Sequence, residues 1–131
     1  MNDRAPVVLR RAPTADIKLP VEVGYDTFKL AYDFKAISLV KEKTGKSLLN
    51  GTLWETIEED PDLVITTIWA GLQLYHPEMS LEDVAHSLLP LDYNLYLKAV
   101  LAAWTKVKPE AKEKADPKAE PTAEPVAAQK T

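Results

Sequence analysis

The chain has 131 residues, of which 46% are hydrophobic, and it carries a formal net charge of −4 with no cysteine. This length supports one modest hydrophobic core and leaves too little material for a second domain. The acidic balance argues against a broad nucleic-acid surface, and the lack of cysteine excludes disulfides and thiolate chemistry. Because no apolar run is long enough for a signal peptide or a membrane span, we expect a soluble protein.

The two ends of the chain predict disorder. Residues 1–15 contain two prolines and no hydrophobic periodicity, and we interpret Arg4, Arg10 and Arg11 as a solvated basic arm. After Lys108 the composition changes to Ala, Pro, Lys and Glu, and the tripeptide Ala-Glu-Pro occurs twice. Such a segment cannot bury enough apolar surface to offset its ordering entropy, so residues 109–131 should form a disordered tail.

A β-hairpin is predicted over residues 17–32. Ile17 to Val23 alternates apolar and polar residues, Gly24-Tyr25-Asp26 suits a tight turn, and Thr27 to Tyr32 alternates again. The inward-facing residues would be Ile17, Leu19, Val21, Val23, Phe28, Leu30 and Tyr32. Because Pro20 cannot donate a ladder hydrogen bond, its strand should lie at an edge. A lone hairpin is marginal in water, so it must pack on helices or join strands of another subunit.

The rest of the ordered region should be helical, with segments at about 33–44, 52–59, 61–76, 81–89 and 92–108. The central helix, 61–76, has both ends defined locally. Asp60 can cap its first turn, Pro61 fits the first helical position, and Pro77 prevents continuation. The spacing of apolar residues predicts that its core-facing residues are Ile65, Ile68, Trp69, Leu72 and Tyr75, with Leu63, Val64 and Ala70 widening the apolar arc.

Capping residues place the other helix ends. Asp33 and Gly45 suit the N-cap and the left-handed stop of the first helix, and Ser80 to Asp83 reads as a capping box. Thr52 and Asp92 are candidate N-caps for the second and last helices. The predicted inner faces are Phe34, Ala36, Ile37 and Val40; Leu81, Val84, Ala85, Leu88 and Leu89; and Tyr96, Val100, Ala103, Trp104 and Val107. We therefore expect an α+β fold, a hairpin packed on about four helices, in a single domain over residues 16–108.

No catalytic pattern is present in the sequence. The chain has four glycines, none spaced for a phosphate-binding loop, and nothing nominates a base to activate a Ser or Thr nucleophile. His76 with Glu78, and Glu82 or Asp83 with His86, are the nearest approach to metal-ligand pairs. A metal site needs three or four convergent ligands, so a surface ion pair at i,i+4 spacing explains His86 better. We expect a non-enzyme without cofactor or metal.

The three tryptophans divide into two kinds. Trp69 and Trp104 lie on regular apolar stripes and should be core residues. Trp54 lies in an irregular apolar segment beside acidic residues, where an aromatic side chain could anchor a partner. The candidate partner-binding residues are Leu48, Leu49, Leu53, Trp54 and Ile57. The alternative that this segment belongs to the core is equally open.

Three segments match a recurring pattern in order. Tyr32 to Ser47 opens with aromatic-Asp-aromatic-x-Ala-Ile and ends its helix with Thr-Gly, Ile68 to Leu72 reads Ile-Trp-Ala-Gly-Leu, and His76 to Val84 contains Pro-Glu-x-Ser. Each piece alone is weak, and their succession is moderately specific. Over roughly residues 17–107 the chain resembles the small tail assembly chaperones of long-tailed, siphovirus-like bacteriophages, prophages and gene transfer agents.

This resemblance implies a non-catalytic role and supplies no catalytic residue. Such proteins bind the long helical tape measure protein, help tail tube protein polymerise around it, and leave before the particle is complete. The implied partners are these two proteins and further copies of the chain, without nucleic acid, membrane or small-molecule substrate. The implied location is the host bacterial cytoplasm and not the mature virion. A virion structural or connector (minor tail) protein is the alternative, followed by a small helical regulatory protein.

Overall fold

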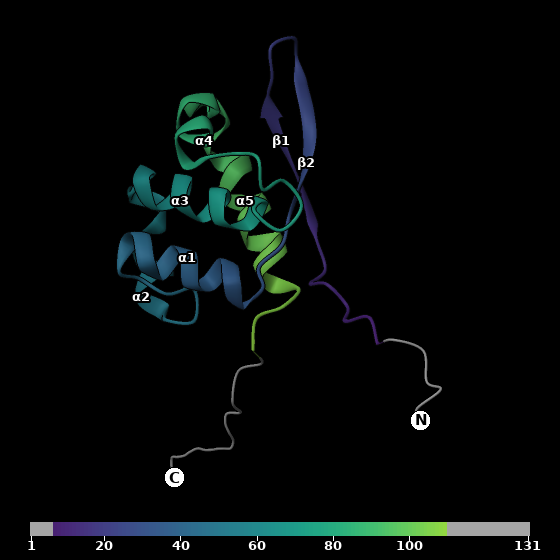
Figure 1. Ribbon diagram of the computed structural model, residues 1–131. Coiled ribbons are helices and arrows are strands. Elements are labelled where there is room, and N and C mark those ends of the chain that lie inside the picture. The colour runs from purple at the N-terminus through teal and green to yellow at the C-terminus, as the bar shows by residue number, and fades with distance from the viewer. Residues whose placement is uncertain (1–6, 110–131) are drawn as a thin grey trace.

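The computed structural model describes residues 7–109, apart from the side chain of Thr52. In this part of the chain an antiparallel hairpin stands beside a group of helices, as Figure 1 shows. The elements are β1 (Ala15–Pro20), β2 (Tyr25–Leu30), α1 (Phe34–Thr44), α2 (Gly51–Thr56), the 3₁₀ helix η1 (Ile57–Glu59), α3 (Pro61–Leu72), α4 (Leu81–Ser87), the 3₁₀ helix η2 (Pro90–Asp92) and α5 (Tyr93–Thr105). The predicted α+β class is confirmed. Of the two ends predicted to be disordered, residues 1–6 and 110–131 lie outside the described residues. Residues 7–14 form no helix or strand, and Ala15, predicted to belong to the disordered arm, is already part of β1.

The hairpin forms as predicted, but its turn comes earlier than the sequence suggested. The antiparallel register places Ile17 opposite Phe28, and the turn spans residues 21–24 instead of 24–26. The Val21 amide donates to the Gly24 carbonyl (3.0 Å), and Gly24 has φ +77°, a conformation that glycine adopts without a steric penalty. Val21 and Val23, predicted to face inward, are exposed because they belong to the turn.

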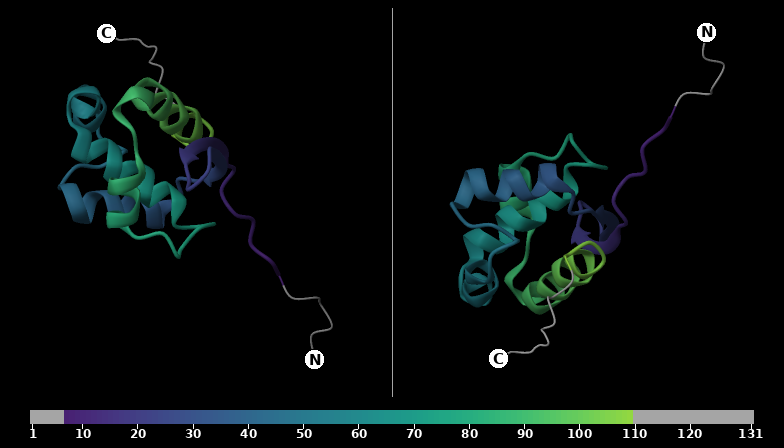
Figure 2. Two further views of the ribbon diagram at one scale, coloured as in Figure 1. Left: turned by 90° about the horizontal axis from the view of Figure 1, so that it is seen from above. Right: turned by 90° about the horizontal axis from the view of Figure 1, so that it is seen from below.

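The hairpin packs its inner face beside α5. Ile17, Leu19 and Leu30 are buried, and Phe28 is partly buried. Figure 2 shows the hairpin beside α5, on the opposite side of the body from α1 and α2, with residues 7–14 leading away from the body. The Tyr25 hydroxyl donates to Asp92 Oδ2 at the start of α5 (3.1 Å), which ties the hairpin to that helix.

Helix α3 is the central element, in contact with α1, α4, α5 and β2. Asp60 accepts a hydrogen bond from the Leu63 amide (3.3 Å) and Pro61 occupies the first turn, as predicted. The helix ends at Leu72 and not at 76. Residues 73–75 form a turn, and the Gln73 side-chain Nε2 donates a hydrogen bond to the Met79 carbonyl (2.8 Å). Of the predicted core-facing residues, Ile68 and Leu72 are buried, Ile65 and Trp69 are partly buried, and Tyr75 is exposed.

Most of the predicted caps are confirmed. The Asp33 side chain accepts from the Ala36 amide (2.9 Å), Gly45 is left-handed with φ +77°, and Ser80 and Asp83 form the reciprocal capping box. The prediction that the Asp92 side chain caps the last helix is wrong. That side chain makes no cap hydrogen bond and accepts one from the Tyr25 hydroxyl instead. The cap expected from the Thr52 side chain lies outside what the structure describes.

The inner faces are confirmed for α5 and partly wrong for α1 and α4. On α5, Tyr96, Val100, Ala103 and Trp104 are buried as predicted. The helix ends at Thr105 and not at 108 as predicted, so the partly buried Val107 lies beyond it. On α1, Ala36 and Val40 are buried and Ile37 is partly buried, but Phe34, at the exposed first position, is 78% exposed. On α4, Val84 is buried, Leu81 is partly buried and Ala85 is exposed. This helix ends at Ser87 and not at 89 as predicted, so Leu88 and Leu89, both partly buried, follow it. A short helix that covers the edge of the body buries one narrow stripe.

Tyr32 joins the end of the hairpin to α3 at a close contact. Its buried ring lies against Gly71, where a Cβ atom would come within 2.7 Å of the ring. The Tyr32 hydroxyl donates to the Thr67 carbonyl (2.8 Å), and the Ala31 amide donates to the Gly71 carbonyl (2.8 Å). Burial raises the pKa of Tyr32 far above its ordinary value, since the ionised form would lose hydration. None of the helices within residues 7–109 has the length and apolar character needed to cross a bilayer.

Candidate partner-binding groove

The structure divides the predicted partner-binding residues. Leu48, Leu53 and Ile57 are buried core residues, which favours the core alternative for these three, and Ile57 also borders the groove described below. Leu49 is 52% exposed and Trp54 is partly buried, so these two remain available for contact. They lie in different cavities and do not form one site.

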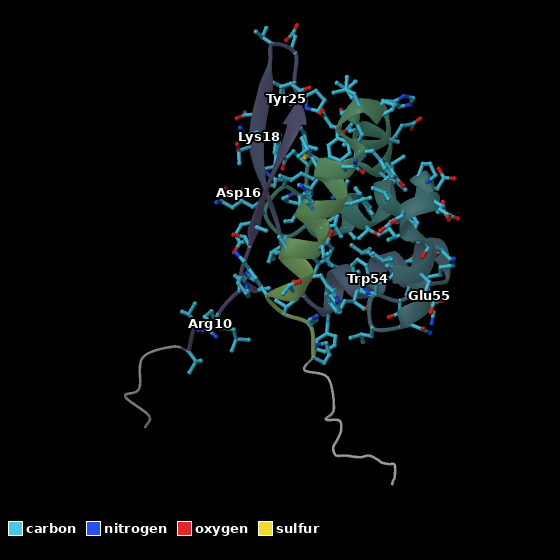
Figure 3. All side chains as sticks on the ribbon, turned by 180° about the vertical axis from the view of Figure 1, so that it is seen from behind. Arg10, Asp16, Lys18, Tyr25, Trp54 and Glu55 are labelled. Atoms are coloured by element: carbon cyan, nitrogen blue, oxygen red, sulfur yellow. The ribbon has the colours of Figure 1, made fainter. Side chains whose placement is uncertain are left out.

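Trp54 stacks on Trp104 at one wall of a surface groove. Their ring centroids are 6.1 Å apart and the ring planes differ by 27°. The Trp54 indole Nε1 donates to the Leu48 carbonyl (2.9 Å), which fixes the ring in place. Figure 3 shows Trp54 and Glu55 across the molecule from Asp16 and Lys18 on the hairpin. None of the residues that line the groove belongs to the hairpin.

The groove encloses about 310 Å³ between the α2–η1 segment and α5. Its lining residues are Trp54, Ile57, Glu58, Leu97, Val100, Leu101, Trp104 and Lys108. Leu101 is 52% exposed, and the charged side chains among the lining residues are Glu58 and Lys108. The groove is thus open and mainly apolar, with one acidic and one basic residue in its lining. This composition suits an amphipathic partner.

Tyr93 holds the two walls of the groove together. Its hydroxyl on α5 lies within hydrogen-bond distance of the carbonyl oxygens of Ile57 (3.1 Å) and Glu58 (3.0 Å). Partial burial raises the pKa of Tyr93, and the nearby charges of Asp60 and Glu58 act in the same direction. The hydroxyl therefore stays protonated as a donor, and η1 is fixed against α5 before any partner arrives.

Sequence reasoning missed the α5 side of this groove. Leu97 and Leu101 thicken the apolar stripe of the last helix, which is the one available signal. Nothing in the sequence indicates that this stripe faces Trp54, about a third of the chain away. Leu49 lines a separate cavity with Phe34 of α1 and Arg10 and Arg11 of the N-terminal arm.

The histidines have structural or surface roles. His76 Nε2 accepts a hydrogen bond from the Lys29 amide (3.0 Å), and its ring meets Phe28 edge-on at 5.2 Å. His86 Nε2 lies 3.6 Å from Glu82 Oε2 on α4, with both side chains exposed, as the i,i+4 spacing indicated. In the described part of the chain no three His, Cys, Asp or Glu side chains converge as metal ligands would.

Trp69 lies apart from the groove. It is partly buried on α3, and Lys43 Nζ is 5.9 Å from the centre of its ring, at the distance of a cation–π contact. The prediction that Trp69 is a core residue is therefore only partly confirmed, because one face of its ring lies beneath Lys43 of α1 and not inside the core.

No protein-family model, curated protein or solved structure matches this chain.

Proposed function

We propose that this chain is a non-catalytic phage tail assembly chaperone that binds the tape measure protein and assists tail tube polymerisation. The observation that supports the proposal best is the open apolar groove walled by Trp54 and Trp104. The family resemblance of the motifs from Tyr32 to Val84 supplies the identity of the partner.

A client with long amphipathic helices presents an apolar stripe about one helix face wide. The groove offers aromatic anchors and the exposed Leu101 to such a stripe, and partners are commonly held through buried aromatic residues of this kind. One groove is too small for tight binding alone. Many copies along one client would compensate by avidity, and each would cover apolar surface that otherwise aggregates.

A groove variant tests client binding directly. Leu101→Lys places a charge in the apolar trough, and we expect it to weaken binding of a tape measure fragment about tenfold or more, because the lysine must be desolvated. Leu91→Lys is the matched control, since Leu91 is 79% exposed and outside the groove. Titration followed by tryptophan fluorescence gives both affinities. Equal affinities of the two variants would contradict the proposed groove.

A second measurement separates the chaperone from a virion structural protein. We expect mass spectrometry of purified particles to find the tail tube and tape measure proteins without this chain, while an infected-cell lysate contains all three. Several copies of the chain per finished particle would favour the structural role and overturn the proposal.

A further inference from the structure

The outer edge of β1 is open for strand pairing. The amides of Lys29 and Ala31 donate to His76 Nε2 and to the Gly71 carbonyl, so at these positions the second strand points its amides away from β1. Hydrogen-bonded and non-hydrogen-bonded pairs alternate along an antiparallel ladder. Because Asp16 lies opposite Lys29, Asp16 and Lys18 must direct their own amides and carbonyls away from β2.

Only a short window of this edge is free. In residues 7–109 no hydrogen bond joins the amide or carbonyl of Asp16 or Lys18 to a group beyond the hairpin. On the same side, Pro20 has no amide proton, and the Thr14 carbonyl accepts from Lys106 Nζ (2.6 Å). The open window is therefore centred on Ile17. Such an edge is a template for another strand.

The side chains of this window are self-complementary. We propose that β1 pairs with β1 of a second copy about a two-fold axis at Ile17, joining the two hairpins into one antiparallel sheet. In this register Asp16 of each copy lies directly opposite Lys18 of the other, and the two residues exchange both backbone hydrogen bonds. Asp16 then lies between two cations, since Lys29 Nζ of its own chain is already 3.3 Å away.

Neighbouring registers are disfavoured by the same residues. A shift of the axis to Asp16 sets two aspartates opposite each other, and a shift to Lys18 sets two lysines opposite each other and brings Pro20 into the ladder. Like charges directly opposite on adjacent strands are destabilising. The sequence of this short strand therefore selects one register for pairing with itself.

Exposed apolar surface lies next to the same edge. Leu95 on α5 is 62% exposed and lines a shallow cavity with Ile17 and Lys18. Figure 3 shows Asp16 and Lys18 along the hairpin, and the Asp16 side chain is 64% exposed. A second copy on the β1 edge would cover Leu95 as well as the backbone groups. This inference stands without the proposed function, because it concerns the isolated chain and not its client.

Charge reversal tests the proposed pairing in the full chain. We expect the native protein to form dimers in sedimentation equilibrium. Asp16→Lys places two lysines opposite each other across the dimer axis, and Lys18→Asp places two aspartates there. Each variant alone should therefore raise the dimer dissociation constant about tenfold or more. An equimolar mixture of the two variants can pair a lysine with an aspartate at both positions, so it should dimerise again as a heterodimer.

The controls separate register from net charge. Glu22→Lys in the turn and Lys35→Asp on α1 change the net charge equally, and both residues are exposed away from the edge. Each control alone should dimerise like the native chain, and circular dichroism should show that all four variants keep the fold. A native chain that stays monomeric would overturn the proposal. So would a dimer unaffected by either edge variant, or an Asp16→Lys and Lys18→Asp mixture that fails to associate.

Discussion

Gly71 shows how a single residue positions the hairpin on the helices. Its missing side chain lets the Tyr32 ring lie against α3, at a point where the Tyr32 hydroxyl also reaches the Thr67 carbonyl. The sequence contains this information only as a glycine inside an apolar helix. Periodicity predicted that the helix is central, but the identity of the aromatic ring beside the glycine depends on the tertiary fold.

Gly71→Ala should therefore destabilise the protein. The new Cβ would meet a fully buried ring at 2.7 Å, and overpacking of this kind costs about 1–3 kcal/mol, partly offset by the better helix propensity of alanine. Gly51→Ala is the control, because nothing lies within 4 Å of a Cβ at that position in α2. Urea unfolding measures both variants. A Gly71→Ala protein as stable as the Gly51→Ala protein would show that the ring moves freely.

At the scale of elements, local chemistry predicted the helix starts well and the tertiary faces less well. Asp33, Asp60 and Ser80 cap as expected because capping depends on the residues of one turn. The hairpin turn was misplaced because the alternation through Val23 continues past the end of β1. Phe34 was assigned to the core because it matches the helical period, but its place at the first position leaves it exposed.

The Asp60 cap carries a measurable share of the stability of α3. Asp60→Ala removes the oxygen that accepts a hydrogen bond from the Leu63 amide, so the free energy of unfolding should fall by about 1 kcal/mol. Asp60→Asn keeps an accepting oxygen and should lose much less. Thermal and urea unfolding of the two variants compares them. If both lose the same amount, the charge of Asp60 and not its hydrogen bond stabilises the helix start.

For the whole molecule, the α+β class and most helix positions could be predicted, and the groove could not. Trp54 was recognised as an unusual aromatic residue, but its stacking on Trp104 depends on how α2 and α5 meet in space. Contacts between segments distant in sequence leave no periodic signal. For the same reason the register of β1 and β2, which determines the open edge, appears only in the structure.

Alkaline pH should unfold the protein through its tyrosines. The pKa values of Tyr32, Tyr93 and Tyr96 are raised in the folded state, chiefly by burial. The unfolded chain therefore releases these protons first, so stability is complete below about pH 10 and falls as the pH rises further. Above about pH 10, the Tyr32→Phe variant should lose about 1.4 kcal/mol less of its free energy of unfolding per pH unit than the native protein. Urea unfolding between pH 9 and 11 measures both proteins, and an unchanged slope would contradict this assignment.

The hydrogen bonds that His76 and Gly71 accept from Lys29 and Ala31 limit how far a sheet built from this chain can grow. They occupy the far edge of the hairpin, so a sheet built from this chain can add strands on one side only. Growth by stacking strand on strand, the route to amyloid fibres, requires two open sides. A sheet formed through β1 therefore ends at the second strand of each hairpin and does not extend into a fibre.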